Sequence, residues 1–186
     1  MSKKLLFLRH SESELDFSIP ASQWGLSRRG RRQAKELALS GSFDDVEYVI
    51  TSEEKKALQT ATPIAERNSL TIYEMSEFNE LNRDVATPVT IAEYEAAVKR
   101  ALEHPHQNIH GWERASKALK RFTRGVHITK SGDGERILVV SHGIVLTLYF
   151  GLLTNEMDNL YKRWKKLGFD DWGIVKNEKV VKDIIH

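Results

Sequence analysis

The sequence of 186 residues contains no cysteine, which excludes disulfide bonds, a thiolate nucleophile and cysteine-bound zinc. This absence fits a reducing compartment, and we expect a cytoplasmic protein. Long apolar runs are also missing, since residues 143–153 are the most apolar stretch and are far shorter than a membrane span. The run 5–8 is too short for the core of a signal peptide, and Arg9 interrupts it. We therefore expect no membrane partner.

Motifs of nucleotide-dependent enzymes are absent as well. There is no glycine-rich phosphate loop and no cluster of aspartates, which argues against an enzyme that uses a nucleotide with magnesium. The net charge of +2 gives no reason to expect a nucleic-acid partner. Two basic clusters, residues 28–32 and 162–166, are interpreted as solvated helix faces, with a positive field that attracts anionic substrates as the alternative.

What the sequence does contain is a series of apolar runs separated by amphipathic segments. Hydrophobic residues make up 40% of the chain and charged residues 29%, which is typical of a globular protein. The pattern predicts one α/β domain over residues 1–186, with three layers: a mostly parallel sheet and helices on both of its faces. The predicted strands span residues 4–9, 46–50, 70–74 and 137–141, followed by a hairpin of 172–176 and 179–184.

Capping residues predict where several helices begin and end. Proline inside a helical pattern predicts a kink or a break, here near Thr62 because Pro63 follows. Another helix should end before Pro105. The predicted N-terminal caps are Ser27, Thr51 with Glu54 in a capping box, Thr90 with Glu93 in a second capping box, and Asn155.

Polar residues follow the predicted strands at the points where these strands end. Arg9 and His10 follow the first strand, and His142 follows the strand 137–141. Because ligands bind outside the carboxyl ends of the strands in an open α/β sheet, these side chains suggest one site for an anion. Lys56 and Glu80, which follow other strands, would add a cation and a carboxyl group. Cations can hold a phosphate, a neutral imidazole can attack phosphorus, and a carboxylic acid can protonate the leaving oxygen.

Five segments of the chain resemble the motifs of one family. Residues 8–13, Leu-Arg-His-Ser-Glu-Ser, are similar to its Arg-His-Gly-Glu-Ser signature. Residues 26–34 and 51–61 resemble its Leu-Thr-x-x-Gly-x-x-Gln-Ala and Ser-x-x-x-Arg-Ala-x-Gln-Thr-Ala segments. Residues 78–80 resemble its Leu-x-Glu acid motif, and residues 140–143 its second histidine motif. By these motifs, which come in order and cover most of the chain, the sequence resembles the histidine phosphatase superfamily, whose members are phosphoglycerate mutase-like.

The resemblance implies a role for each matching residue. His10 would be the nucleophile that becomes phosphohistidine, and Arg9 and His142 would bind phosphoryl oxygens. Glu80 would be the acid for the leaving group and then the base for water. Lys56 and Ser52 would also bind the phosphate. The alternatives are that Ser52 is only a turn residue and that Lys56 is an ordinary solvated lysine. No metal or other cofactor is expected, because cationic side chains surround the oxygens.

Two positions depart from the family pattern. Ser11, which we count among the substrate-binding residues, replaces the glycine after the histidine, where it could crowd the phosphate or be a tolerated substitution. Lys56 replaces an arginine, so that the charge is kept but the planar fork is lost. Glu74 and Glu77 compete with Glu80 as the acid. The remaining histidines show no metal-ligand spacing and are interpreted as surface residues: His104, His106, His110, His127 and His186.

The expected function is metal-independent hydrolysis of a small phosphorylated metabolite through phosphohistidine. A hydrolase is preferred over a mutase because the chain is short compared with the mutases of the family. A protein-phosphohistidine phosphatase is the alternative within enzymes. A weakly active or inactive module that binds a phosphorylated ligand is the alternative outside enzymes, and the replacements at Ser11 and Lys56 support it. The sequence leaves the oligomeric state and the substrate open.

Overall fold

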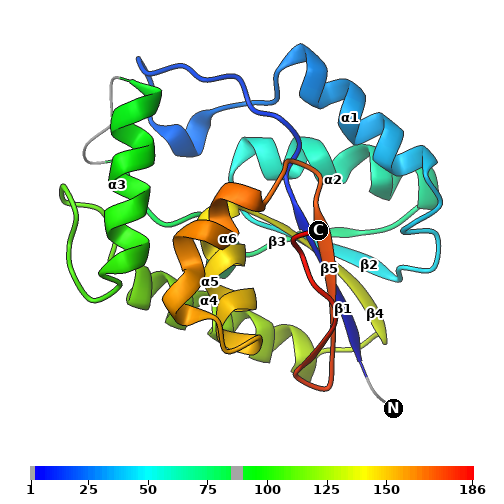
Figure 1. The fold of residues 1–186 in the computed structure, drawn as a ribbon. Helices are drawn as coiled ribbons and strands as arrows, with labels where there is room; N and C mark the ends of the chain where they lie inside the picture. Colours follow the sequence, from blue (N-terminus) through cyan, green and yellow to red (C-terminus); the bar gives the residue numbers. More distant parts are fainter. Residues whose placement is uncertain (1–2, 85–89) are drawn as a thin grey trace.

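A six-stranded sheet lies at the centre of the computed structural model, which describes residues 3–84 and 90–186. The strands lie in the order β3-β2-β4-β1-β5-β6 (Figure 1). They are β1 (Lys4–Arg9), β2 (Tyr48–Thr51), β3 (Ile72–Glu74), β4 (Arg136–Ser141), β5 (Trp172–Lys176) and β6 (Lys179–Lys182). The first four strands in this order are parallel, and β5 and β6 are antiparallel to their neighbours. The predicted mostly parallel sheet and closing hairpin are confirmed.

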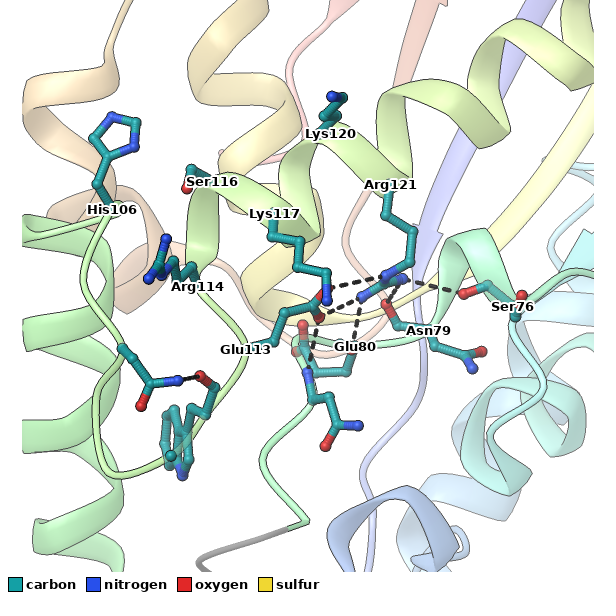
Figure 2. A pocket seen from close by; sticks show the side chains of 14 residues that line it. Ser76, Asn79, Glu80, His106, Glu113, Arg114, Ser116, Lys117, Lys120 and Arg121 are labelled. Atoms are coloured by element: carbon teal, nitrogen blue, oxygen red, sulfur yellow. Dashed lines mark hydrogen bonds and ion pairs between the residues drawn. The ribbon is translucent and has the colours of Figure 1, made fainter.

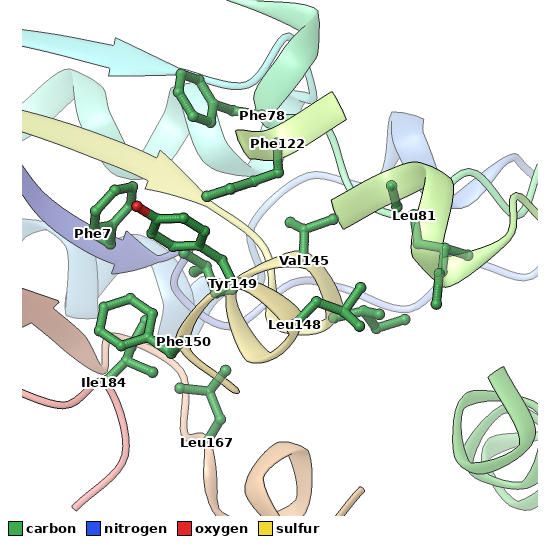
Figure 3. Packing of buried hydrophobic residues seen from close by; sticks show 14 of the residues in the cluster. Phe7, Phe78, Leu81, Phe122, Val145, Leu148, Tyr149, Phe150, Leu167 and Ile184 are labelled. Atoms are coloured by element: carbon green, nitrogen blue, oxygen red, sulfur yellow. The ribbon is translucent and has the colours of Figure 1, made fainter. Parts of the chain in front are cut away.

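Alternating apolar side chains of the central strands explain why helices cover both faces of the sheet (Figure 1). Leu6 and Leu8 pack with α1 (Arg28–Leu39) and α2 (Lys55–Asn68) on one face. Phe7 packs on the other face among the aromatic side chains of the larger core cluster (Figure 3). The helices that contribute to this cluster are α3 (Ile91–Glu103), α4 (Ala115–Ser131), α5 (Gly143–Leu153) and α6 (Leu160–Lys166). Three-residue 3₁₀ turns are η1 (Ala21–Gln23), η2 (Ser76–Phe78) and η3 (Met157–Asn159).

Two of the predicted caps are confirmed. The Ser27 hydroxyl accepts a hydrogen bond from the Gly30 N–H at 3.0 Å and begins α1. The Thr90 hydroxyl accepts one from the Glu93 N–H at 3.2 Å, and α3 then ends at Glu103, before the proline at position 105. Within the described ranges, no helix has the length and apolarity needed to cross a membrane.

Other local predictions are wrong. Thr51 is the last residue of β2, so it forms no capping box, and α2 begins three residues later than this box requires. The helix α2 does not break at Pro63, because its buried face is held against the sheet, and a kink at this position stays a prediction. Asn155 does not cap a helix: it has a left-handed φ of 58°, and Asn159 precedes α6. Arg163 in the second basic cluster is buried between Glu156 and Asp183 and is not solvated.

Candidate active site

The two histidines of the predicted site lie side by side at the carboxyl edge of the sheet. Parallel pairing aligns Arg9 at the end of β1 with Ser141 at the end of β4. The His10 N–H continues this ladder, since it donates to the Ser141 carbonyl at 2.9 Å, and the Ser52 N–H donates to the Val140 carbonyl at 3.1 Å. The ring centroids of His10 and His142 are 5.1 Å apart. The structure therefore brings together residues that are distant in the sequence.

A hydrogen bond to the backbone fixes the tautomer of His10. Its Nδ1 lies 2.7 Å from the Ser11 carbonyl oxygen, which can only accept, so Nδ1 carries the proton and Nε2 has a free lone pair. The side chain is buried, and this burial, together with His142, Lys56 and Arg9, holds the pKa of His10 well below its usual value. His10 is therefore a neutral imidazole at pH 7, as a nucleophile has to be.

Ser52 orients the second histidine. Its hydroxyl lies 2.6 Å from His142 Nε2 and accepts a hydrogen bond from the Glu54 N–H at 3.2 Å, so it can donate its own hydrogen to Nε2. The proton of the imidazole is then on Nδ1, which is buried and has no hydrogen-bond partner within the described ranges. Burial, followed by Lys56 and nearby arginines, lowers the pKa of His142 well below its usual value. An anion would supply the acceptor that this donor lacks.

Arg9 lies flat between two packing surfaces. Its guanidinium is 4.3 Å from the centroid of the Phe169 ring, and it donates to the Leu167 carbonyl oxygen. On the second surface, a Cβ atom at Gly143 would be 3.2 Å from Nε of Arg9, so the glycine of the second histidine motif makes room for the guanidinium. The Arg9 Nε is buried and has no partner among the residues that the structure describes. Arg9 is thus held rigidly and keeps a donor for an anion.

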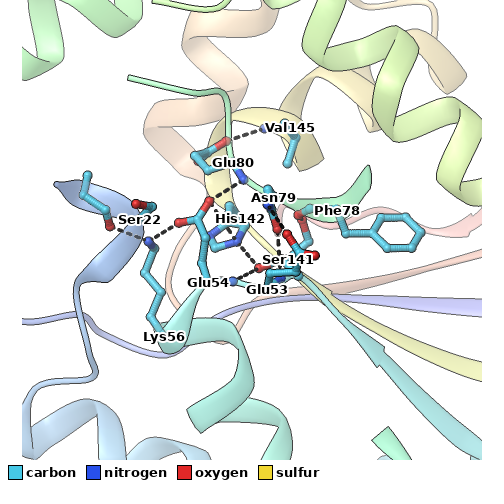
Figure 4. A network of polar contacts seen from close by, with 12 residues as sticks. Ser22, Glu53, Glu54, Lys56, Phe78, Asn79, Glu80, Ser141, His142 and Val145 are labelled. Carbon is cyan, nitrogen blue, oxygen red and sulfur yellow. Dashed lines mark hydrogen bonds and ion pairs between the residues drawn. The ribbon is translucent and has the colours of Figure 1, made fainter. Parts of the chain in front are cut away.

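Lys56 is buried rather than solvated, with 1% of its surface exposed. Its ammonium group forms an ion pair with Glu54 and donates to the Ala21 carbonyl at 2.8 Å, which leaves one of its three donors (Figure 4). The interpretation of Lys56 as an ordinary surface lysine is therefore wrong. Its ion-pair partner Glu54 lies 3.7 Å from His142 Nε2, so the charge of Lys56 is beside the site. This charge adds to burial in lowering the pKa of both histidines.

Among the three competing carboxylates, Glu80 is the one that lies in the site. Glu74 is exposed and Glu77 forms an ion pair with Arg124, whereas Glu80 is buried. The Glu80 carboxylate accepts hydrogen bonds from the backbone N–H groups of Leu81, Ile144 and Val145 at 2.9, 2.9 and 3.1 Å. To protonate a leaving group, its oxygen has to exchange one of these donors for the substrate, so the acid role of Glu80 stays a prediction.

Comparison with known proteins decides the family. The sequence profile of the histidine phosphatase superfamily (branch 1) matches residues 5–171. This chain belongs to the histidine phosphatase superfamily. It is 26% identical over 171 residues to phosphoserine phosphatase 1 of Hydrogenobacter thermophilus, covering 85% of this chain and 80% of that protein. The family match and this relative identify the chain as a phosphatase.

Solved structures show the same fold. The mycobacterial glucosyl-3-phosphoglycerate phosphatase superposes with a TM-score of 0.78 at 18% identity, and the match covers 100% of both chains. Bacillus stearothermophilus YhfR has a TM-score of 0.78 at 21% identity, covering 97% of this chain and 95% of that one. The predicted fold, with the architecture of phosphoglycerate mutase-like histidine phosphatases, is confirmed.

Ser11 does not point into open space in this histidine phosphatase. It is fully buried, its hydroxyl donates to the Asp170 carboxylate, and its N–H donates to the Thr60 hydroxyl at 3.0 Å. Burial raises the pKa of Asp170 above its usual value, although Ser11 and Arg9 oppose this rise. The serine that replaces glycine thus links the segment after β1 to the segment after α6. A contact of Ser11 with phosphate stays a prediction.

Two residues of this histidine phosphatase that the sequence did not reveal hold the backbone of Glu80 in place. Glu54 Oε1 accepts the Glu80 N–H at 2.7 Å and lies 3.7 Å from His142 Nε2 (Figure 4). Arg121 of α4 donates to the carbonyl oxygens of Asn79 and Glu80 at 2.9 and 3.1 Å, and to the Glu113 carboxylate at 2.9 Å (Figure 2). Sequence reasoning assigned Glu54 to a capping box and gave Arg121 no role, because no short motif marks either contact.

The other five histidines of this histidine phosphatase are exposed, as predicted. Within residues 3–84 and 90–186, no three His, Asp or Glu side chains form a group suited to a metal ion.

Proposed function

We propose that this phosphatase hydrolyses small phosphomonoesters through a phosphohistidine on His10, without a metal ion. The observation that supports this proposal most is the state of His10, whose Nδ1–H donates to the Ser11 carbonyl at 2.7 Å while Nε2 is unprotonated. A buried, neutral imidazole with its lone pair free is ready for attack on phosphorus, and Arg9 and Lys56 supply positive charge beside it.

The reaction proceeds in two steps. In the first, His10 Nε2 forms a bond to phosphorus, the bond from phosphorus to the ester oxygen breaks, and Glu80 gives its proton to the departing alcohol. In the second, the Glu80 carboxylate takes a proton from water and the water oxygen forms a bond to phosphorus. The bond from phosphorus to His10 Nε2 breaks, which restores the neutral imidazole and releases inorganic phosphate. His142, Arg9 and Lys56 hold the phosphoryl oxygens in both steps.

The small size of the substrate follows from two observations. The curated relative is named for phosphoserine, and a structural neighbour is named for glucosyl-3-phosphoglycerate, both of which are small phosphate esters. In addition, Tyr94 of α3 lies near a cavity that Glu80 lines, since its ring centroid is 5.3 Å from the guanidinium of Arg83, which lines the same cavity. A helix in this place leaves less room for a protein carrying phosphohistidine than for a metabolite.

Turnover of p-nitrophenyl phosphate by purified protein tests the proposal. We expect hydrolysis that is unchanged by EDTA, and turnover of several alkyl phosphates in a metabolite panel. Loss of activity with EDTA that a divalent cation restores would contradict the metal-independent mechanism. A protein that binds phosphate but turns over none of these esters would be a binding module, and one that dephosphorylates only phosphohistidine in a protein would match the other alternative.

A further inference from the structure

Arg83 is a largely buried cation near the candidate site. Only 7% of its surface is exposed, and its guanidinium lies between the rings of Trp24 and Tyr94, at 5.8 and 5.3 Å from their centroids. Among the residues that the structure describes, no oxygen forms a hydrogen bond or ion pair with it. Its donors are therefore not used by these residues and are available to a ligand in the cavity that Arg83 lines.

The carboxylates around Arg83 are already bound to other groups. Both Asp84 oxygens accept hydrogen bonds from Ser22, at 3.3 and 2.6 Å. Glu54 is bound to Lys56 and to the Glu80 N–H, and the Glu80 oxygens are bound to three backbone N–H groups. These carboxylates balance the charge of Arg83 from a distance without using its donors.

Arg83 lies beside two carboxylates of the candidate site. Arg83 lines a cavity of about 250 Å³ together with Glu54, Glu80 and Ser22. Its charge acts on His142, whose pKa is lowered first by burial and then by Lys56 and Arg83. Glu54 connects this cavity to the second histidine, since its Oε1 lies 3.7 Å from His142 Nε2. A small ester with its phosphate at the histidines can therefore extend a second group towards Arg83.

We propose that Arg83 determines specificity by binding a carboxylate of the phosphomonoester substrate. A planar guanidinium has two parallel donors that fit the two oxygens of a carboxylate, and the flanking rings of Trp24 and Tyr94 fix its plane. A second phosphate would carry about two negative charges towards Glu54, Glu80 and Asp84, so a singly charged carboxylate fits better. This inference rests on the proposed function and narrows its substrate class.

The test compares 3-phosphoglycerate with 2-hydroxyethyl phosphate, which lacks only the carboxylate. In Arg83→Met we expect kcat/KM for 3-phosphoglycerate to fall at least about tenfold, mainly through KM, and less than about threefold for 2-hydroxyethyl phosphate. Arg83→Lys should recover part of the loss. Arg32→Met removes an exposed arginine of α1 and should behave as wild type.

Equal losses on both esters would overturn the proposal, because Arg83 would then act on Glu80 and His142 instead of on the substrate. Binding of the same two esters to His10→Ala and to His10→Ala with Arg83→Met, by calorimetry, separates recognition from catalysis. We expect the Arg83 change to weaken only 3-phosphoglycerate. A protein inactive on p-nitrophenyl phosphate that still shows this difference would contradict the proposed hydrolysis but support the role of Arg83, whereas no difference would refute that role.

Discussion

Replacing Arg121 with methionine should lower the free energy of unfolding by about 3 kcal/mol and slow the hydrolysis of alkyl phosphates. The Arg121 guanidinium donates to the carbonyl oxygens of Ser76, Glu77, Asn79 and Glu80 at 3.1, 2.9, 2.9 and 3.1 Å. One side chain thus fixes the backbone of the loop that positions the catalytic carboxylate (Figure 2).

The expected loss in the free energy of unfolding follows from the groups that lose their hydrogen-bond partner in Arg121→Met. Hydrogen bonds from a charged donor contribute roughly 1.5 kcal/mol or more each, but water can replace part of them at a side chain that is 19% exposed. The Glu113 carboxylate, 9% exposed, would lose its ion-pair partner, and an unpaired carboxylate of this burial is destabilising. Arg124, one helical turn away, is the matched control because it is 66% exposed and has a single ion pair, so Arg124→Met should cost less than about 1 kcal/mol.

Urea unfolding followed by circular dichroism measures the first effect, and kcat on an alkyl phosphate measures the second. We expect Arg121→Met to lose about tenfold in kcat, because displacement of Glu80 by a fraction of an ångström weakens proton transfer. If Arg121→Met were as stable as Arg124→Met, the loop would not depend on this guanidinium, and the reasoning would be refuted.

Two further predictions concern protonation. Because burial depresses the pKa of His10 and His142 in the folded state, stability should be full above pH of about 6.5 and fall as the pH drops below it, when the unfolded chain takes up protons first. Urea unfolding at several pH values measures this effect. The free energy of unfolding should depend less on pH in the double variant His10→Gln with His142→Gln than in wild type. In Glu80→Gln, kcat should fall more for alkyl than for aryl phosphates, because an alkoxide leaving group needs a proton more. If Glu54→Gln and not Glu80→Gln showed this difference, Glu54 would be the acid.

Patterns that depend on neighbouring residues in the sequence predicted the fold well. Buried strands predict a parallel sheet because both faces need cover, and the caps at Ser27 and Thr90 need only a hydroxyl and an N–H three residues on. The same rule failed at Thr51, because pairing with β4 extends β2 through this residue and tertiary structure outweighs local capping. The break that Pro63 allows does not occur, because the buried face of α2 is held by the sheet.

Site residues with a motif were found, and those defined by long-range contacts were not. The motifs identified His10 and His142, which the sheet then places together. Arg83 and Arg121 contact residues on other elements or a cavity, so their burial and partners become visible only after folding. Asp170 likewise accepts a hydrogen bond from Ser11, and no pattern in the sequence marks this contact.

The formation of phosphohistidine on His10 is the central claim, and trapping it is the most direct test. Protein mixed with a labelled phosphomonoester and quenched in alkali should contain phosphate that is stable to alkali, labile to acid and located by peptide mapping on His10. His10→Ala should contain none while keeping its fold, and His127→Ala, which removes an exposed histidine, should match wild type. Phosphate on another residue, or full turnover by His10→Ala, would contradict the mechanism.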